Sequence, residues 1–164
     1  MFLQGINQQE GEIVMSPSTN DEKFEALKIE NQICFPLYAS SRCVIKQYTP
    51  FLEAIDQTYT QYITMLVLWE RKKLNVKQLG QYLYLDSGTL TPLLKKLEKK
   101  GLISRHRSLE DERNLIITIT EEGEKLREKA VDIPPQMFEF CPLSEEEVKT
   151  LSGLLYKILD QSGE

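Results

Sequence analysis

Three cysteines, and a tyrosine placed close to the first of them, are the residues of this chain best suited to chemistry. Cys34, Cys43 and Cys141 are odd in number and lack zinc-like spacing, so neither a disulfide framework nor a metal site is expected. Tyr38 follows Cys34 by four residues, which puts the thiol and the phenol on one face of a helix. A phenol that donates to sulfur stabilises the thiolate, and a thiolate attacks peroxide to give a sulfenic acid.

The alternative for Cys34 is a small, inert apolar residue in the core. Cys43 cannot bridge to Cys34 within one helix, because nine residues at about 100° each put the two on opposite sides, about 13 Å apart along the axis. A disulfide needs Cα atoms within about 7 Å, so we expect Cys43 to be structural.

Positive charge is concentrated in residues 87–107, although the chain carries a net charge of −5. This segment holds Lys95, Lys96, Lys99, Lys100, Arg105 and Arg107 against the single acid Glu98. Such asymmetry is typical of phosphate binding. The alternative is a solvated basic face of a helix.

Apolar periodicity and capping residues predict the elements that position these side chains. The expected helices cover 22–48 (bent at Pro36 and ended by Pro50), 60–70, 76–83, 88–100 and 121–130; a last helix opens at a Ser144–Glu147 capping box and carries apolar residues from Val148 to Leu159. The expected caps are Asn75, Asp86 or Ser87, and Thr120 at helix starts, and Gly101 at a helix end. The expected strands cover 102–108 and 114–120. A proline deep inside a helix is costly, whereas one in or near the first turn is not. Because of Pro92, we therefore expect the helix that ends at Lys100 to begin at Gly88 or Thr89. Two short helices joined at Leu85 and Asp86 form a helix-turn-helix, and the hairpin after them forms a "wing" with a charged tip at 109–113.

The fold class expected is mainly α with a small β-hairpin wing: a winged helix-turn-helix with N- and C-terminal dimerisation helices. Residues 1–20 are expected to be a disordered leader. Residues 21–164 form one chain unit, with dimerisation helices at about 22–48 and 121–160 and a winged part at about 60–120. The apolar stripe of the last helix packs either on a partner subunit or on the chain's own first helix. With neither a secretory signal nor a membrane span in the sequence, we expect a cytoplasmic protein.

Several segments resemble the MarR family of bacterial regulators, and specifically its organic-hydroperoxide-sensing branch. The resemblance runs from about Lys28 to the last helix. The matching segments are Glu30-Asn31-Gln32-Ile33-Cys34-Phe35, Leu37-Tyr38-Ala39-Ser40-Ser41, Thr58-Tyr59-Thr60-Gln61-Tyr62, Tyr84-Leu85-Asp86-Ser87-Gly88-Thr89-Leu90-Thr91-Pro92-Leu93-Leu94-Lys95 and Asp111-Glu112-Arg113.

The resemblance implies a homodimer that binds double-stranded, palindromic operator DNA. No cofactor is expected. A recognition helix enters the major groove by its N-terminus, where Ser87, Thr89 and Thr91 stand. Phosphate contacts are expected from Lys95, Lys96 and Lys99, and from Arg105 and Arg107, for which strand-edge solubility charges are the alternative. The resemblance also implies that Arg113 of the wing reaches the minor groove while Asp111 fixes the wing.

For sensing, the resemblance implies that Tyr48 and Tyr59 join Tyr38 in supporting the Cys34 thiolate, one of them from the other subunit. Oxidation of Cys34 by an organic hydroperoxide then releases the DNA. The oxidised cysteine forms either an intersubunit disulfide, for which Cys141 is the candidate, or an adduct with a low-molecular-weight thiol. Two other functions stay open: a regulator of the same family gated by a phenolic or other small ligand, and a thiol peroxidase.

Overall fold

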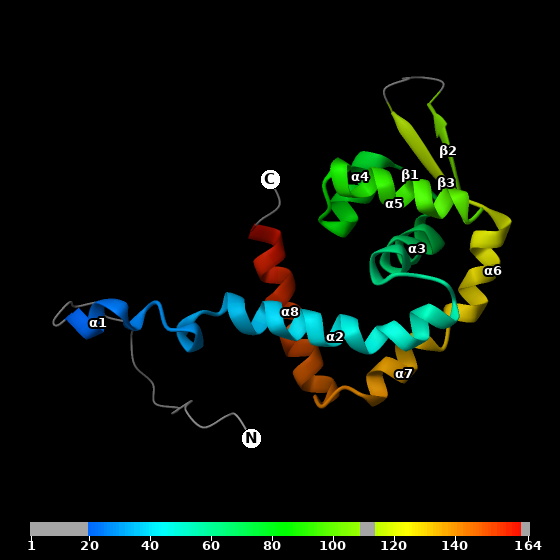
Figure 1. The fold of residues 1–164 in the computed structure, drawn as a ribbon. Coiled ribbons are helices and arrows are strands. Elements are labelled where there is room, and N and C mark those ends of the chain that lie inside the picture. The colour runs from blue at the N-terminus through cyan, green and yellow to red at the C-terminus, as the bar shows by residue number, and fades with distance from the viewer. Residues whose placement is uncertain (1–19, 109–113, 162–164) are drawn as a thin grey trace. The chain divides into compact units, whose positions relative to one another are not determined.

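The computed structural model describes residues 20–108 and 114–161, which fall into two compact units divided after Cys43. Figure 1 labels the elements in chain order. Among the described residues, no helix is both long and apolar enough to cross a membrane. Residues 1–19 of the expected leader, and the tip of the wing, lie outside the described part of the chain; Asn20 already begins a helix.

The first unit shows that the single helix predicted over 22–48 is wrong. It holds α1 (Asn20–Glu25), the short 3-10 helix η1 (Ile29–Asn31) and the beginning of α2 (Cys34–Ala54). Lys28 and Gln32 adopt extended backbone conformations on either side of η1, and these interrupt the helical path. The apolar spacing carried no sign of these breaks.

The two prolines of this region act differently from the prediction. Pro36 lies in the first turn of α2, where its missing N–H has no helical partner to lose, so it sits at a helix start rather than at a bend. Pro50 lies inside α2, which continues to Ala54. Burial of Leu52 in the core of the second unit, where it is 2% exposed, supports the last turn in spite of the lost hydrogen bond.

In the second unit, α3 (Tyr59–Arg71) and α4 (Val76–Leu83) confirm the predicted helices. Each begins with a reciprocal capping box, from Thr58 and Gln61 in α3 and from Asn75 and Gln78 in α4. Helix α4 ends in a left-handed residue, Tyr84, with φ of 53°.

Helix α5 (Ser87–Lys99) follows after a tight turn, and Asp86 caps it through the Thr89 N–H. The predicted late start is wrong, because α5 begins at Ser87 and Pro92 lies in its second turn. Gly101, with φ of 72°, follows the helix end as the sequence predicted. The helix-turn-helix is therefore confirmed.

A three-stranded antiparallel sheet completes the winged part, in the order β1-β3-β2. Strands β2 (Ile103–Arg107) and β3 (Leu115–Ile119) confirm the predicted hairpin. The prediction missed β1 (Lys73–Asn75), which pairs Leu74 with Ile117. Three residues are too few to show the alternation by which strands are found.

The chain ends in α6 (Glu121–Ala130), α7 (Ile133–Glu139) and α8 (Glu145–Gln161). The Thr120 cap of α6 and the Ser144 capping box of α8 are confirmed. Helix α7 was not predicted.

The core of the second unit lies under α5 and binds it to its neighbours. Leu90, Leu94 and Leu97 of α5 are at most 1% exposed. The indole N–H of Trp69 in α3 donates to the backbone oxygen of Gly123 in α6 at 2.7 Å, which ties these two helices together. The other core side chains are Leu52, Tyr62, Met65, Leu68, Leu74, Leu79, Leu102, Ile103, Ile117, Leu126, Ala130, Ile133 and Met137.

Candidate functional site

Cys34 is the first residue of α2 and is exposed, so the expectation of a cysteine inside a longer helix is wrong. Tyr38 follows one turn later and is 58% exposed. Its hydroxyl oxygen accepts a hydrogen bond from Nη1 of Arg42 at 2.6 Å, in the same unit. Since the guanidinium only donates, the phenolic proton stays available for another acceptor, and the bond from Arg42 polarises it.

Tyr48 of α2 and Tyr59 of α3 meet in the second unit. Their ring centroids are 5.2 Å apart in an edge-to-face arrangement, and Tyr62 lies 5.9 Å from Tyr48. Burial raises the pKa of Tyr48, with a smaller effect from Tyr59, and burial also raises the pKa of Tyr59. Burial, together with these two neighbours, raises the pKa of Tyr62 to about 12. These phenols are therefore hydrogen-bond donors at neutral pH.

All three cysteines are free thiols in this structure. Cys43 is exposed on the same helix as Cys34, nine residues further along the chain. Cys141 is half-buried between α7 and α8, and its N–H donates to the oxygen of Phe138 at 3.0 Å. No group of three or more potential metal ligands occurs among the described residues.

The N-terminal half of α5 presents Ser87, Thr89 and Thr91 on the surface. The Thr89 hydroxyl donates to the Asp86 carboxylate at 2.9 Å, and the Thr91 hydroxyl donates to the Ser87 oxygen at 2.7 Å. The backbone N–H of Thr89, followed by its hydroxyl, lowers the pKa of Asp86. With their protons engaged, Thr89 and Thr91 face outward as acceptors, which suits the amino groups of cytosine and adenine.

The cations of residues 87–107 divide into two groups. Lys95, Lys96 and Lys99 are exposed and form no ion pair with the described part of the chain. Arg105, whose side chain is 18% exposed, instead holds Glu98 through Nη2 at 2.5 Å and Nε at 2.9 Å. This contact lowers the pKa of Glu98. A phosphate contact by Arg105 would therefore require this pair to open.

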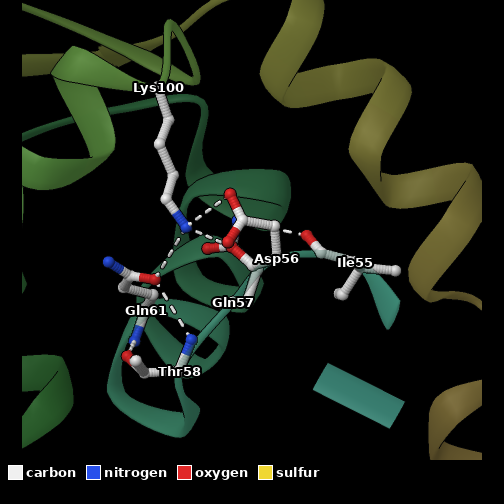
Figure 2. Close-up of polar contacts among 6 residues, drawn as sticks. All are labelled: Ile55, Asp56, Gln57, Thr58, Gln61 and Lys100. Carbon is white, nitrogen blue, oxygen red and sulfur yellow. Dashed lines mark hydrogen bonds and ion pairs between the residues drawn. The ribbon is translucent and has the colours of Figure 1, made fainter. Parts of the chain in front are cut away.

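Lys100 is also engaged within the chain. Figure 2 shows its ammonium group directed at Asp56, in the segment before α3, and at Gln61, in the first turn of α3. The sequence did not predict this contact, nor the hydrogen bond of Arg42 with Tyr38. The spacing of Arg42 from Tyr38 could have revealed the second, whereas Lys100 and Asp56 are 44 residues apart and nothing local signals their contact.

The wing residues are only partly described. Arg107 is exposed at the end of β2, where it pairs with Leu115 of β3. Asp111 and Arg113 lie outside the described residues.

Comparison with known proteins places the chain among transcriptional regulators. Residues 46–130 match the family model described as transcriptional regulator SarA/Rot. The chain is 52% identical over 140 residues to the organic hydroperoxide resistance transcriptional regulator of Bacillus subtilis, covering 85% of this chain and 95% of that protein. It is 45% identical over 134 residues to the regulator SarZ of Staphylococcus haemolyticus, covering 82% and 91%.

Among solved structures, the chain is similar to AbfR, a protein of Staphylococcus epidermidis. Reduced AbfR bound to DNA matches with a TM-score of 0.71 and 34% identity, over 87% of this chain and 99% of that one. Other AbfR structures represent an overoxidised form bound to DNA and a disulfide form. The chain belongs to the MarR family of winged helix-turn-helix transcriptional regulators, in its organic-hydroperoxide-sensing branch, and is a redox-sensing DNA-binding regulator and not an enzyme.

Proposed function

We propose that this regulator is a cytoplasmic homodimer that represses transcription from a palindromic operator and leaves it when an organic hydroperoxide oxidises Cys34. The observation that carries the proposal is the exposed Cys34 thiol at the N-terminus of α2, in a chain 52% identical to an organic hydroperoxide resistance regulator.

The tyrosines support the same role. Tyr38 donates from the next turn of α2, with its oxygen held by Arg42. Tyr48 and Tyr59 remain protonated donors, since burial raises the pKa of both. In the proposed dimer, these phenols hydrogen-bond the Cys34 thiolate, one of them from the other subunit, and loss of these bonds on oxidation changes the favoured dimer geometry.

The C-terminal helix supports dimerisation. Leu151, Leu154 and Ile158 of α8 recur at helical spacing and are 43%, 56% and 52% exposed. A single chain leaves this apolar stripe in water, so we propose that a second copy covers it.

For DNA binding, we propose that Ser87, Thr89 and Thr91 meet base edges and that Lys95, Lys96 and Lys99 meet phosphates. Arg107 and Arg113 of the wing contact the adjacent groove, with Asp111 positioning the wing. Arg105 keeps its pair with Glu98 in this proposal and holds β2 against α5.

Substitution of Cys34 tests the redox switch. We expect Cys34→Ser to bind operator DNA with the affinity of the reduced wild type and to stay bound in cumene hydroperoxide, whereas Cys43→Ser is released normally. A Cys34→Ser protein that peroxide still releases would refute the role of Cys34. Release by a salicylate-like phenol in the absence of peroxide would instead favour the ligand-gated alternative.

The fate of the oxidised cysteine is tested by non-reducing mass analysis after one equivalent of peroxide. A crosslink between Cys34 and Cys141 of two subunits is expected if Cys141 resolves the sulfenic acid, and Cys141→Ser then removes it. An adduct with an added small thiol, unchanged in Cys141→Ser, supports the other branch. An untouched Cys34 thiol would contradict the proposal.

A further inference from the structure

Lys100, the C-cap residue of the recognition helix α5, reaches out of that helix to the segment that joins α2 to α3, residues 55–58 (the α2–α3 loop). Its ammonium nitrogen forms an ion pair with Oδ2 of Asp56 at 3.1 Å and donates to the backbone oxygen of the same residue. It also lies 3.4 Å from Oε1 of Gln61. Three acceptors on two residues therefore surround one cation.

The α2–α3 loop has a defined shape that presents these acceptors. Asp56 adopts a left-handed conformation with φ of 52°, which aspartate tolerates better than most residues. The N–H of Gln57 donates to the oxygen of Leu52 at 2.8 Å, and its side chain is buried. Gln61, 3% exposed, accepts from the Thr58 N–H through the same Oε1 that faces Lys100.

The same loop separates two of the tyrosines assigned to sensing. Tyr48 precedes it on α2, Tyr59 is the first residue after it on α3, and their rings are in contact. A change in the packing of these rings must therefore act on the loop that Lys100 holds.

We infer that Lys100 is a positioning residue that couples the sensing tyrosines to the recognition helix, rather than a phosphate ligand. This inference rests on the proposed redox switch. With the Lys100 contacts present, a displacement of the α2–α3 loop also displaces the end of α5; without them, the loop moves and α5 keeps its place. Lys99 is exposed on the same helix and forms no ion pair in the described part of the chain. It therefore serves as the comparison, as a lysine that is available to phosphate.

The test compares Lys100→Gln with the matched control Lys99→Gln, since both remove one positive charge from the end of α5. Operator dissociation constants are measured for reduced and cumene hydroperoxide-treated homodimers over a range of salt concentrations, and loss of the Cys34 thiol is followed separately. We expect Lys100→Gln to oxidise like wild type and keep its salt slope, while the ratio of oxidised to reduced dissociation constants falls about fivefold. Lys99→Gln should keep this ratio and lower the salt slope by about two for the two subunits.

Asp56→Asn is the second variant, because asparagine also tolerates the left-handed conformation. It should reproduce the fall in the ratio, and the double variant should show no further fall. A wild-type ratio in Lys100→Gln, with a salt slope lowered as in Lys99→Gln, would make Lys100 a phosphate ligand and overturn the inference while the redox switch stands. A ratio of one in the wild type would refute the switch and the coupling together.

Discussion

Gly80 of α4 allows the helix-turn-helix to close, and replacing it with alanine tests this packing directly. A Cβ atom at Gly80 would lie 2.7 Å from the backbone oxygen of Leu85 and 3.3 Å from Cδ1 of Leu90. Carbon and oxygen atoms ordinarily stay about 3.3 Å or more apart. The Leu85 N–H also donates to the Gly80 oxygen at 3.0 Å, so the turn that must move is anchored to the same residue.

The magnitude follows from two opposing effects. Alanine is favoured over glycine in a helix interior by roughly 0.5–1 kcal/mol. Overpacking that forces a backbone shift costs about 1–3 kcal/mol. The net range is roughly 0–2.5 kcal/mol, so we expect Gly80→Ala to lower the free energy of unfolding by about 1 kcal/mol. It should also weaken operator binding, because the turn sets the position of α5.

Gly153→Ala in α8 is the matched control. Its Cβ would meet no described atom within 4 Å, and Gly153 follows Leu151 by two residues, a rotation of about 200° that puts it opposite the apolar stripe. This variant should gain about 0.5–1 kcal/mol. Urea denaturation at one fixed protomer concentration measures both variants. Equal gains in stability, with unchanged operator affinity of Gly80→Ala, would refute the packing argument.

Three further predictions concern the core, the cap of α5 and the wing. Trp69→Phe removes the donor to the Gly123 oxygen and should lower the free energy of unfolding by about 1–2 kcal/mol in urea titrations. Thr89 lowers the pKa of Asp86, so the ionised carboxylate stabilises the folded state fully above pH 3.8, and this stabilisation is lost as the pH falls through the lowered pKa. Asp86→Asn should therefore make the free energy of unfolding depend less on pH in this acid range. Arg113→Ala should weaken operator binding in a shift assay without changing the thermal unfolding temperature.

Local signals in the sequence predicted the winged part well. Asn75 and Thr120 cap helices where expected, and Gly101 ends α5, because capping depends on residues within one turn of each other. The hairpin followed from two β-rich runs around a polar segment. What failed depends on contacts between distant residues: β1 exists only because Leu74 pairs with Ile117, and α2 passes Pro50 because its last turn is packed in the core.

In the candidate site, too, features set by neighbouring residues were predicted and features set by distant contacts were not. Cys34 and Tyr38 were found because four residues make one helical turn, although the position of Cys34 at the start of α2 was not. The contact of Tyr48 with Tyr59 joins two helices, and only the family resemblance drew attention to these residues.

The sequence and the structure differ most in which cations of residues 87–107 they make available to DNA phosphates. A count of cations in residues 87–107 treats them as equal ligands for phosphate. In the fold, Arg105 is directed at Glu98 and Lys100 at Asp56, and both cations hold α5 to its neighbours. Each phosphate contact contributes about 0.9 to the salt slope, so a count that includes both residues overestimates the slope of a dimer by about four. We therefore propose that these two cations fix the helix on which Lys95, Lys96 and Lys99 are exposed, rather than bind phosphate themselves.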